Sequence, residues 1–323
     1  MRRVRAVASG VLVATLAASA GPLGAQQRVP GWERVAPAGG HQNDIQLLRP
    51  DGGPVVPIFE GWYPNPDGSH QLCFGYFNVN TEEVLEIPVG RDNRVEPEQF
   101  NGLQPTHFLP VPPGGRRHYC IFSVTVPEDW GDRDVVWTLR DPRTHGVGQE
   151  YTSPGRTRFE TYHLEEPRQE SRERVAPRVR LDPDGPEAMG RTPVSVGPYR
   201  AMAGEPLTLP ILVRRDNPFN EDDRMAMTFR WYKYQGPGDV SFAVTGGRRV
   251  APGGRAVIDS ESWTTAPDAW GEAETEATFG APGDYRLLLQ VYNDAGGRIQ
   301  TSDFEFFCCW TNVLVDVSVD SRD

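Results

Sequence analysis

Short stretches that alternate apolar and polar residues, separated by turns rich in glycine and proline, run through most of this chain. The turns read "PDGG", "NPDGS", "PPGG", "TGG", "APGG" and "DAGG", and stretches with a helical period are almost absent. Glycine suits a turn because it adopts positive φ, and proline because its ring presets φ. Regular turns between short β-rich segments are typical of sandwiches. The sequence therefore predicts an all-β protein made of antiparallel β-sandwiches.

The first predicted sandwich covers residues 40–155. Its segments with strand character read "VVPIFEGWY", "HQLCFGYFNV", "EVLEIPV", "HYCIFSVTVP" and "DVVWTLR". In the fourth segment, Cys120, Phe122, Val124 and Val126 share one face, because side chains alternate along a strand. Tyr119, Ser123 and Thr125 share the other face.

The stretch 156–190 differs in composition from its neighbours. It contains "LEEPRQESRERVAPRVRLDPDGPEAMG", which mixes charges with prolines and has few large apolar residues. Such segments are usually solvated spacers. We predict a linker here, followed by a second domain at residues 191–320.

The second domain contains the segment "EATFGAPGDYRLLLQVYND" and an earlier strand that carries Trp231. The segment resembles a strand of immunoglobulin-like and PKD-like domains in which a Pro-Gly turn precedes a tyrosine. Tyr285 stands where such domains form a tyrosine corner, and Trp231 where they bury a core tryptophan. Leu287 occupies the place of the second cysteine of antibody domains, so the resemblance is to a sandwich without that disulfide. It implies a fold and no particular function.

The first domain is expected to be a second sandwich of the same class. Trp137 follows Cys120 rather than lying between two cysteines, which departs from the immunoglobulin pattern. The chain as a whole resembles an exported bacterial protein.

The N-terminal sequence "MRRVRAVASGVLVATLAASAGPLGAQQ" has the parts of a secretory signal peptide. Arginines precede a short apolar run, and "LGA" supplies small residues for cleavage before Gln26. We predict that residues 1–25 are removed and that the mature chain is exported, to a periplasm or to the outside. No other stretch approaches the roughly 20 apolar residues of a membrane helix, so no membrane span is predicted.

The chain has 33 basic and 44 acidic residues, and its formal net charge is −11. A protein of this charge has no electrostatic reason to bind nucleic acid or an anionic membrane. The partner that we expect is a protein or a glycan, and the sequence does not identify it.

Four cysteines in an exported protein predict disulfides. Cys73 and Cys120 lie on predicted strands of the first domain, and we expect them to pair, with two buried thiols as the alternative. Cys308 and Cys309 are adjacent, and neighbouring side chains of a strand point to opposite faces. Their Cα atoms are about 3.8 Å apart, less than the roughly 4.4–6.8 Å of most disulfides. A bond between them requires a local departure from strand geometry.

The residues around the adjacent cysteines indicate such a departure. Apolar residues occupy even positions before the pair, at Phe304 and Phe306, and odd positions after it, from Val313 to Val319. This change of phase needs a bulge or a turn. Three states remain open: a vicinal disulfide, free thiols in an aromatic cluster, and crossed bonds to the other two cysteines. A metal site is not expected, because no histidine or second cysteine pair stands at zinc spacing.

The loop "RRDNPFNEDDR" gathers oxygen atoms of the kind that bind Ca²⁺. Its candidate ligands are Asp216, Asn220, Asp222 and Asp223. It lacks the glycine and the final glutamate of an EF-hand loop, so we interpret it as solvated, with calcium as the alternative and no other cofactor. The chain has no GxSxG, HExxH, P-loop or CxxCH motif, and we predict that it is not an enzyme.

The first function hypothesis is an exported, non-enzymatic binding or structural module. The segment 293–312 would join the last two strands at a sandwich end, where recognition loops cluster. Its aromatic residues either pack on the protein itself or form a recognition surface. These residues are Phe304, Phe306, Phe307 and Trp310.

The alternative is a polysaccharide-active enzyme or a carbohydrate-binding accessory protein on a β-sandwich scaffold. Two carboxylates in a cleft, one with a raised pKa, would support the enzyme. A sugar-stacking surface would need exposed tryptophans. The tryptophans near turns, where exposure is expected, are Trp62, Trp130, Trp263 and Trp270.

Overall fold

The computed structural model describes residues 48–110, 117–141, 150–157, 176–214, 226–244, 250–251, 255–256, 270–294 and 310–322 of the chain. The regular structure in these ranges is almost entirely β-strand, which confirms the predicted all-β class. The described strands belong to one compact unit, Leu47–Asp323. A search of these residues finds no helix that is long and apolar enough to cross a membrane.

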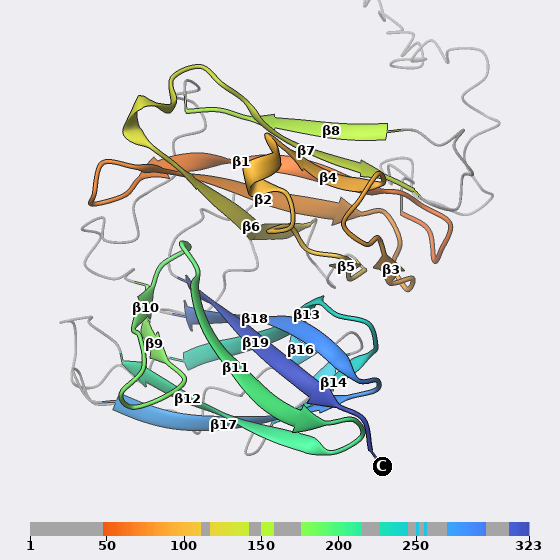
Figure 1. Ribbon diagram of the computed structural model, residues 1–323, viewed down its shortest axis with the longest axis vertical. Helices are drawn as coiled ribbons and strands as arrows, with labels where there is room; N and C mark the ends of the chain where they lie inside the picture. Colours follow the sequence, from red (N-terminus) through yellow and green to blue (C-terminus); the bar gives the residue numbers. More distant parts are fainter. Residues whose placement is uncertain are drawn as a thin grey trace, which may run out of the picture. The chain divides into compact units, whose positions relative to one another are not determined.

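The N-terminal strands form two three-stranded antiparallel sheets (Figure 1). The first sheet has the order β1-β2-β6 and consists of β1 (Val55–Pro64), β2 (His70–Asn78) and β6 (His118–Val126). The second has the order β4-β7-β8 and consists of β4 (Asn93–Glu96), β7 (Val135–Arg140) and β8 (Glu150–Gly155). The short strands β3 (Leu85–Glu86) and β5 (His107–Phe108) pair with each other.

The two N-terminal sheets contribute side chains to one buried cluster, which we call the first core. It contains aromatic residues packed around Trp137. This side chain is fully buried, and its indole Nε1 donates to Asn93 Oδ1 at 3.0 Å. Phe74 and Phe122 meet the indole edge-on, with ring centroids 6.3 and 5.5 Å away. A buried indole that has both apolar neighbours and a partner for its N–H is well accommodated. Trp137 is therefore part of the framework of the protein.

The C-terminal strands form a five-stranded and a four-stranded sheet (Figure 1). The five-stranded sheet has the order β10 (Ala188–Met189), β9 (Arg178–Arg180), β12 (Pro206–Arg214), β17 (Trp270–Phe279) and β14 (Val240–Val244). The four-stranded sheet has the order β11 (Val194–Met202), β19 (Trp310–Asp320), β18 (Gly283–Asp294) and β13 (Ala226–Gln235). Strand β11 runs parallel to β19. A small ribbon joins β15 (Val250–Ala251) and β16 (Arg255–Ala256).

The two C-terminal sheets form a β-sandwich around a second core. Trp231 of β13 is fully buried there, and its Nε1 donates to Thr275 Oγ1 of β17 at 3.0 Å. It stacks on Phe242 of β14, with ring centroids 5.8 Å apart. Leu287, fully buried, belongs to the same core. The alternation of inward residues along each strand thus places one face of every strand in a common core.

Tyr285 ties two turns of this sandwich together. Its hydroxyl donates to the Ala281 carbonyl oxygen at 2.8 Å and accepts from the Gly238 amide at 3.0 Å. Gly236 has φ +142° and passes so close to the ring that a Cβ there would lie 2.2 Å from Tyr285 Cδ1. The turn before β14 therefore depends on both the tyrosine and the glycine.

Replacement of Tyr285 by phenylalanine is expected to lower the free energy of unfolding by about 1–3 kcal/mol. The ring stays, but the Gly238 amide and the Ala281 carbonyl lose their shared partner, and unsatisfied groups of this kind cost about that much. Urea unfolding of the two proteins measures the difference. An unchanged transition midpoint would contradict this role of the hydroxyl.

Three short turns are joined by main-chain hydrogen bonds at one end of the C-terminal sandwich, which we call the closed end. Gly204 N donates to Phe279 O and Gly280 N to Asp239 O, both at 2.8 Å. The turns connect β11 to β12, β13 to β14 and β17 to β18. Because each strand crosses the sandwich, the strand ends that flank residues 215–225, 245–269 and 295–309 lie at the opposite end, which we call the open end.

The C-terminal part of the predicted linker belongs to the five-stranded sheet. Strand β9 pairs with β12, and Val179 is fully buried opposite Val213. Its neighbours Arg178 and Arg180 point away from the core and bind Glu187 in ion pairs. The polar composition suggested a spacer because only alternate residues of so short a strand are apolar. Residues 158–175 lie outside the described ranges.

The outer face of the four-stranded sheet packs against the first core. Tyr232 and Tyr234 of β13 and Leu288 of β18 are buried in the same apolar cluster as the N-terminal aromatic residues. Tyr234 Oη donates to the Leu103 carbonyl oxygen at 2.5 Å, and the Thr106 amide donates to Tyr234 O at 2.9 Å. The two sets of sheets are therefore in direct apolar and hydrogen-bonded contact.

Candidate functional site

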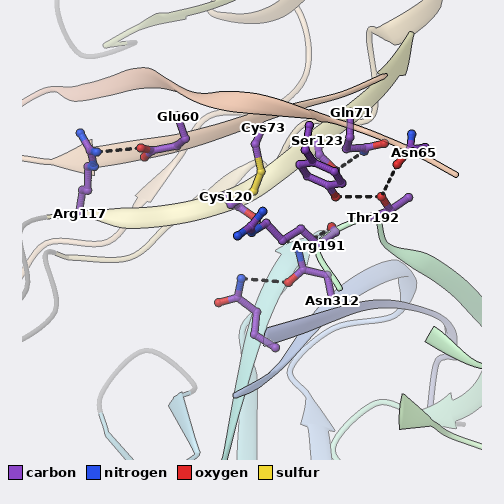
Figure 2. The surroundings of a disulfide bond; sticks show 12 residues. Glu60, Asn65, Gln71, Cys73, Arg117, Cys120, Ser123, Arg191, Thr192 and Asn312 are labelled. Carbon is purple, nitrogen blue, oxygen red and sulfur yellow. Dashed lines mark hydrogen bonds and ion pairs between the residues drawn. A yellow bond between two sulfur atoms is a disulfide. The ribbon is translucent and has the colours of Figure 1, made fainter. Parts of the chain in front are cut away.

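The sheet β1-β2-β6 is irregular along one row that crosses all three of its strands. The register shifts between Phe59 and Gly61 in β1 and between Phe74 and Tyr76 in β2. Cys120, in the matching part of β6, has φ 46°. Irregularities of this kind redirect side chains. Along this row lie a disulfide and the ion pair between Glu60 and Arg117 (Figure 2).

The disulfide joins Cys73 of β2 to Cys120 of β6, as the sequence predicts. The two Cα atoms are 5.1 Å apart, and both residues are fully buried. Tyr63 of β1 and Trp310 of β19 are buried in the same cluster. The first residue of β19 therefore packs beside a disulfide of the N-terminal sheet. We call this contact region the junction. Its residues are Tyr63, Cys73, Cys120, Arg191, Trp310 and Asn312.

Polar groups complete the junction around Thr192 and Asn65 (Figure 2). Tyr63 Oη lies 2.9 Å from Thr192 Oγ1, and Thr192 donates to Asn65 Oδ1 at 3.4 Å. Burial raises the pKa of Tyr63 to about 12, although hydrogen bonding with Thr192 opposes this shift. Arg191, only 1% exposed, places its guanidinium carbon 5.4 Å from the centre of the Tyr63 ring and 5.2 Å from that of Trp310. Guanidinium groups are attracted to such aromatic faces.

Asn312 links β19 to three parts of the chain. Its Nδ2 donates to Arg191 O at 3.0 Å and to Cys120 O at 3.4 Å, and its Oδ1 accepts from Gln290 Nε2 at 3.1 Å. The main-chain N–H of Asn312 donates to the main-chain oxygen of Gly190 at 3.0 Å. Polar side chains that are buried need such partners. The beginning of β19 is therefore held by side-chain and main-chain bonds at once.

Glu60 is the described carboxyl group with the most strongly altered acidity. Its side chain is 1% exposed, and Arg117 NH2 lies 2.8 Å from Glu60 Oε2. Burial raises the pKa of Glu60 to about 8, against the opposing positive charge of Arg117. Desolvation disfavours the charged form of a carboxyl in this way. A raised pKa is one mark of a general acid, but no second carboxylate acts on Glu60 among the described residues.

A second buried charge lies where β3 and β5 meet β13. Lys233 Nζ and His107 Nδ1 both lie 2.6 Å from Glu86 Oε1. The Lys233 side chain is 4% exposed, whereas Glu86 is 43% exposed. Burial tends to raise the pKa of Glu86, but His107 and Lys233 together hold it below its usual value. The arrangement joins the two sets of sheets electrostatically.

Replacing Glu86 alone and replacing Lys233 alone are expected to lower the free energy of unfolding by different amounts. Replacing Glu86 by alanine leaves a buried ammonium group without its acceptor, and we expect a loss of about 1–3 kcal/mol of unfolding free energy. This is less than for a fully buried pair, because Glu86 is near water. Replacing Lys233 by methionine leaves only a half-exposed carboxylate beside His107, so we expect a smaller loss. Urea titrations compare the variants; equal losses would contradict the asymmetry.

Several residues that the sequence singles out lie outside the described ranges. They are Asp216, Asn220, Asp222, Asp223, Trp263, Phe304, Phe306, Phe307, Cys308 and Cys309. Trp231 and Tyr285 lie in the second core, and Trp310 is 4% exposed, which makes it unavailable for stacking on a ligand. Within the described part of the chain, no group of three or more histidine, cysteine, aspartate or glutamate residues could hold a metal ion.

The described tryptophans near turns are buried or half-buried. Trp130 is 4% exposed, and the guanidinium of Arg133 lies 3.8 Å from its ring centre. Trp270 is half-buried, with the guanidinium carbons of Arg180 and Arg214 at 4.8 and 5.4 Å from the ring centre. Trp62 is also half-buried and makes a T-shaped contact with the His70 ring, with centroids 5.4 Å apart. A sugar would have to displace an arginine from Trp130 or Trp270 in order to stack on the same ring face.

No sequence motif points to the polar residues of the junction or to the pair of Glu60 and Arg117. The sequence does, however, show polar residues within or beside apolar strands. Glu60 interrupts the apolar strand "VVPIFEGWY", Gln290 the apolar strand "YRLLLQVY", and Asn312 precedes the alternating valines of β19. A polar residue on an otherwise apolar strand face must find a buried partner or face water. The sequence alone does not say which partner it finds.

Comparison with known proteins adds no functional assignment. A scan against models of protein families finds no match to this chain, and a search of curated proteins finds none either. The fold and the geometry of the described residues therefore carry the functional argument.

Proposed function

We propose that this protein is an exported, non-enzymatic binding or structural module whose C-terminal sandwich is immunoglobulin-like. Two observations support the fold class. Trp231 is buried between the sheets, and the Tyr285 hydroxyl binds a carbonyl a few residues upstream. Both are features of immunoglobulin-like domains. Export is supported by the predicted signal peptide and by the buried disulfide.

The observation that carries the binding proposal is the unequal length of the connections at the two ends of the sandwich. The closed end has only short turns, joined to each other by hydrogen bonds. The strand ends that flank residues 215–225, 245–269 and 295–309 all lie at the open end. Long connections gathered at one end of a sandwich are where such folds place recognition surfaces. The connection 295–309 contains Phe304, Phe306 and Phe307.

The described ionisable groups favour binding over catalysis. Glu60 pairs with Arg117, and Glu86 with Lys233 and His107, and both sets lie inside the framework. Neither brings two carboxylates together as glycoside cleavage requires. The junction, in turn, holds the strand at which the connection 295–309 ends. We infer that the N-terminal sheets serve as a rigid support for the open end.

A binding screen with matched variants tests the proposal. The mature chain, residues 26–323, is screened on a glycan array and against purified envelope proteins. A variant in which Phe304, Phe306 and Phe307 are changed to serine is expected to lose binding at least tenfold and to keep its unfolding midpoint. The control changes Glu205 and Arg322 to alanine; these form an exposed ion pair of 3.0 Å at the closed end. Equal binding by all three proteins would overturn the proposal, as would hydrolysis of a polysaccharide.

A further inference from the structure

The carboxyl group of Glu60 lies in surroundings that favour its neutral form. The residue is 6% exposed, and Arg117 NH2 is 2.8 Å from Oε2. Apart from this ion pair, neither carboxyl oxygen has a hydrogen-bond partner in the described part of the chain. A buried carboxylate normally accepts several hydrogen bonds, and it is costly without them. An ionised Glu60 therefore has the positive charge of Arg117 for compensation, but it lacks the hydrogen bonds that a buried carboxylate normally accepts.

Gly75 creates the space that the carboxyl group occupies. A Cβ at this position would lie 2.3 Å from Glu60 Oε1 and 2.4 Å from the main-chain oxygen of His118. Any side chain at position 75 would thus collide with both atoms. The absence of a side chain lets Glu60 reach from β1 over β2 toward Arg117 at the beginning of β6. Glu60 Oε1 and the His118 carbonyl oxygen both lie close to the position that a Cβ of residue 75 would take.

Two oxygen atoms with lone pairs repel each other unless a proton lies between them. A carbonyl oxygen can only accept a hydrogen bond, and an ionised carboxylate can only accept one as well. A protonated carboxyl group, by contrast, has an O–H that can donate to the His118 carbonyl. A proton on Oε1 would therefore allow a hydrogen bond to that carbonyl, which the ionised form cannot make.

The other groups around Glu60 do not replace this proton. On β6 the His118 ring is turned elsewhere, because its Nε2 donates to Pro110 O at 2.8 Å and the ring stacks on Tyr76. On β8 the neighbouring Ser153 is neutral and accepts from the Phe59 amide. Among the described charges, only Arg117 acts on the acidity of Glu60.

We propose that Glu60 is a proton-controlled latch on the beginning of β6. When Glu60 is ionised, its carboxylate holds the guanidinium of Arg117. When Glu60 takes up a proton, the O–H turns to the His118 carbonyl and the attraction to Arg117 falls. Arg117, which is 32% exposed and lies over the Tyr119 ring at 4.8 Å, then rehydrates. One proton is bound from solvent in this step, and no other bond is made or broken.

Protonation of Glu60 stabilises the folded protein, so the free energy of unfolding should fall as pH rises. The pKa of Glu60 in the folded protein is about 8, above the ordinary value of 4.5. The folded state therefore binds the proton more tightly than the unfolded chain does. The contribution of Glu60 to stability is fully present below pH 4.5 and is lost as pH rises toward 8. The variant Glu60→Gln, which imitates the protonated form, should not show this loss.

The test compares unfolding temperatures of the full mature protein between pH 5 and 9.5. The Tm of Glu60→Gln minus that of the natural protein is expected to rise steadily from pH 5 and to level off near pH 8. In an Arg117→Ala background the same difference should level off at a higher pH, because the compensating charge is gone. The control Glu150→Gln changes an exposed carboxylate paired with Arg94 and Arg140, and its difference should stay flat over the whole pH range. A flat difference for Glu60→Gln would overturn the proposal.

Two spectroscopic readouts separate the latch from a simple change in stability. The infrared band of a neutral carboxylic acid should disappear as pH rises through about 8, the pKa of Glu60 in the folded protein, and it should be absent in Glu60→Gln. At pH 9, amide exchange at residues 117–120 should be faster in Glu60→Gln than in the natural protein, whereas at pH 6 the two should agree. If the carboxylic acid band is missing at pH 6, Glu60 holds no proton and the latch does not exist.

Discussion

Replacement of Trp310 by alanine is expected to lower the free energy of unfolding by about 3–5 kcal/mol, the range for a large aromatic residue removed from a core. Trp310 is 4% exposed and stacks on Tyr292, with ring centroids 5.5 Å apart. It also shares a buried cluster with the disulfide cysteines. Its removal leaves a cavity between the N-terminal sheet and β19, and the surrounding backbone is hydrogen-bonded too firmly to close it.

Urea unfolding of the full chain measures this loss, and Trp270→Ala is the matched control. Trp270 is a tryptophan at the first position of a strand, as Trp310 is, but it is half-buried on the outer side of its sheet. Its removal is expected to cost about 1 kcal/mol, because little cavity forms at a partly exposed site. A loss below 1 kcal/mol for Trp310→Ala would show that the junction does not hold β19.

Removal of the disulfide, by changing Cys73 and Cys120 together to alanine, is expected to cost about 4 kcal/mol. The bond closes a loop with a sequence separation of 47 residues. A crosslink over such a distance restricts the unfolded chain by roughly this amount on the loop-entropy account. Both cysteines are fully buried, so the alanine variant also loses the packing of two sulfur atoms.

The expected damage reaches beyond the N-terminal sheet, because the junction couples the disulfide to β19. A double-mutant cycle between Trp310→Ala and the double cysteine variant should give a coupling energy of about 0.5–3 kcal/mol, as residues in contact do. The control changes Cys308 and Cys309 to alanine and should leave the Cys73–Cys120 bond intact by peptide mapping. Additive losses, or a double cysteine variant as stable as the natural chain, would refute this coupling.

The residues that sequence reasoning placed well are those whose role depends on near neighbours. Alternation of apolar residues predicts which face of β6 and of β19 is buried, and turn residues predict where strands end. Tyr285 follows a Pro-Gly turn and binds Ala281, four residues upstream, which is a local contact. The pairing of Cys73 with Cys120 was the simplest choice within one set of strands, and it is confirmed.

The polar residues of the candidate site depend on contacts between distant parts of the chain. Tyr63 and Thr192 are 129 positions apart, and Glu86 and Lys233 are 147 apart. The position of Glu60 follows from a bulge in β1 and from a glycine on the neighbouring strand, which period-2 alternation does not reveal. The strands β9 and β10 were hidden in a polar stretch, because pairing with β12 and the burial of Val179 outweigh a weak local preference.

The sequence by itself thus determined the all-β class, the disulfide within the N-terminal sheets and the core roles of Trp231 and Tyr285. Tertiary structure alone decided that Trp310 and Asn312 pack on that disulfide, that Lys233 meets Glu86, and that Glu60 lies beside a carbonyl oxygen with a single cation for compensation. The physical reason is that alternation and turn chemistry act between residues near in sequence. The partner of a buried polar group, by contrast, is chosen by the packing of the whole fold.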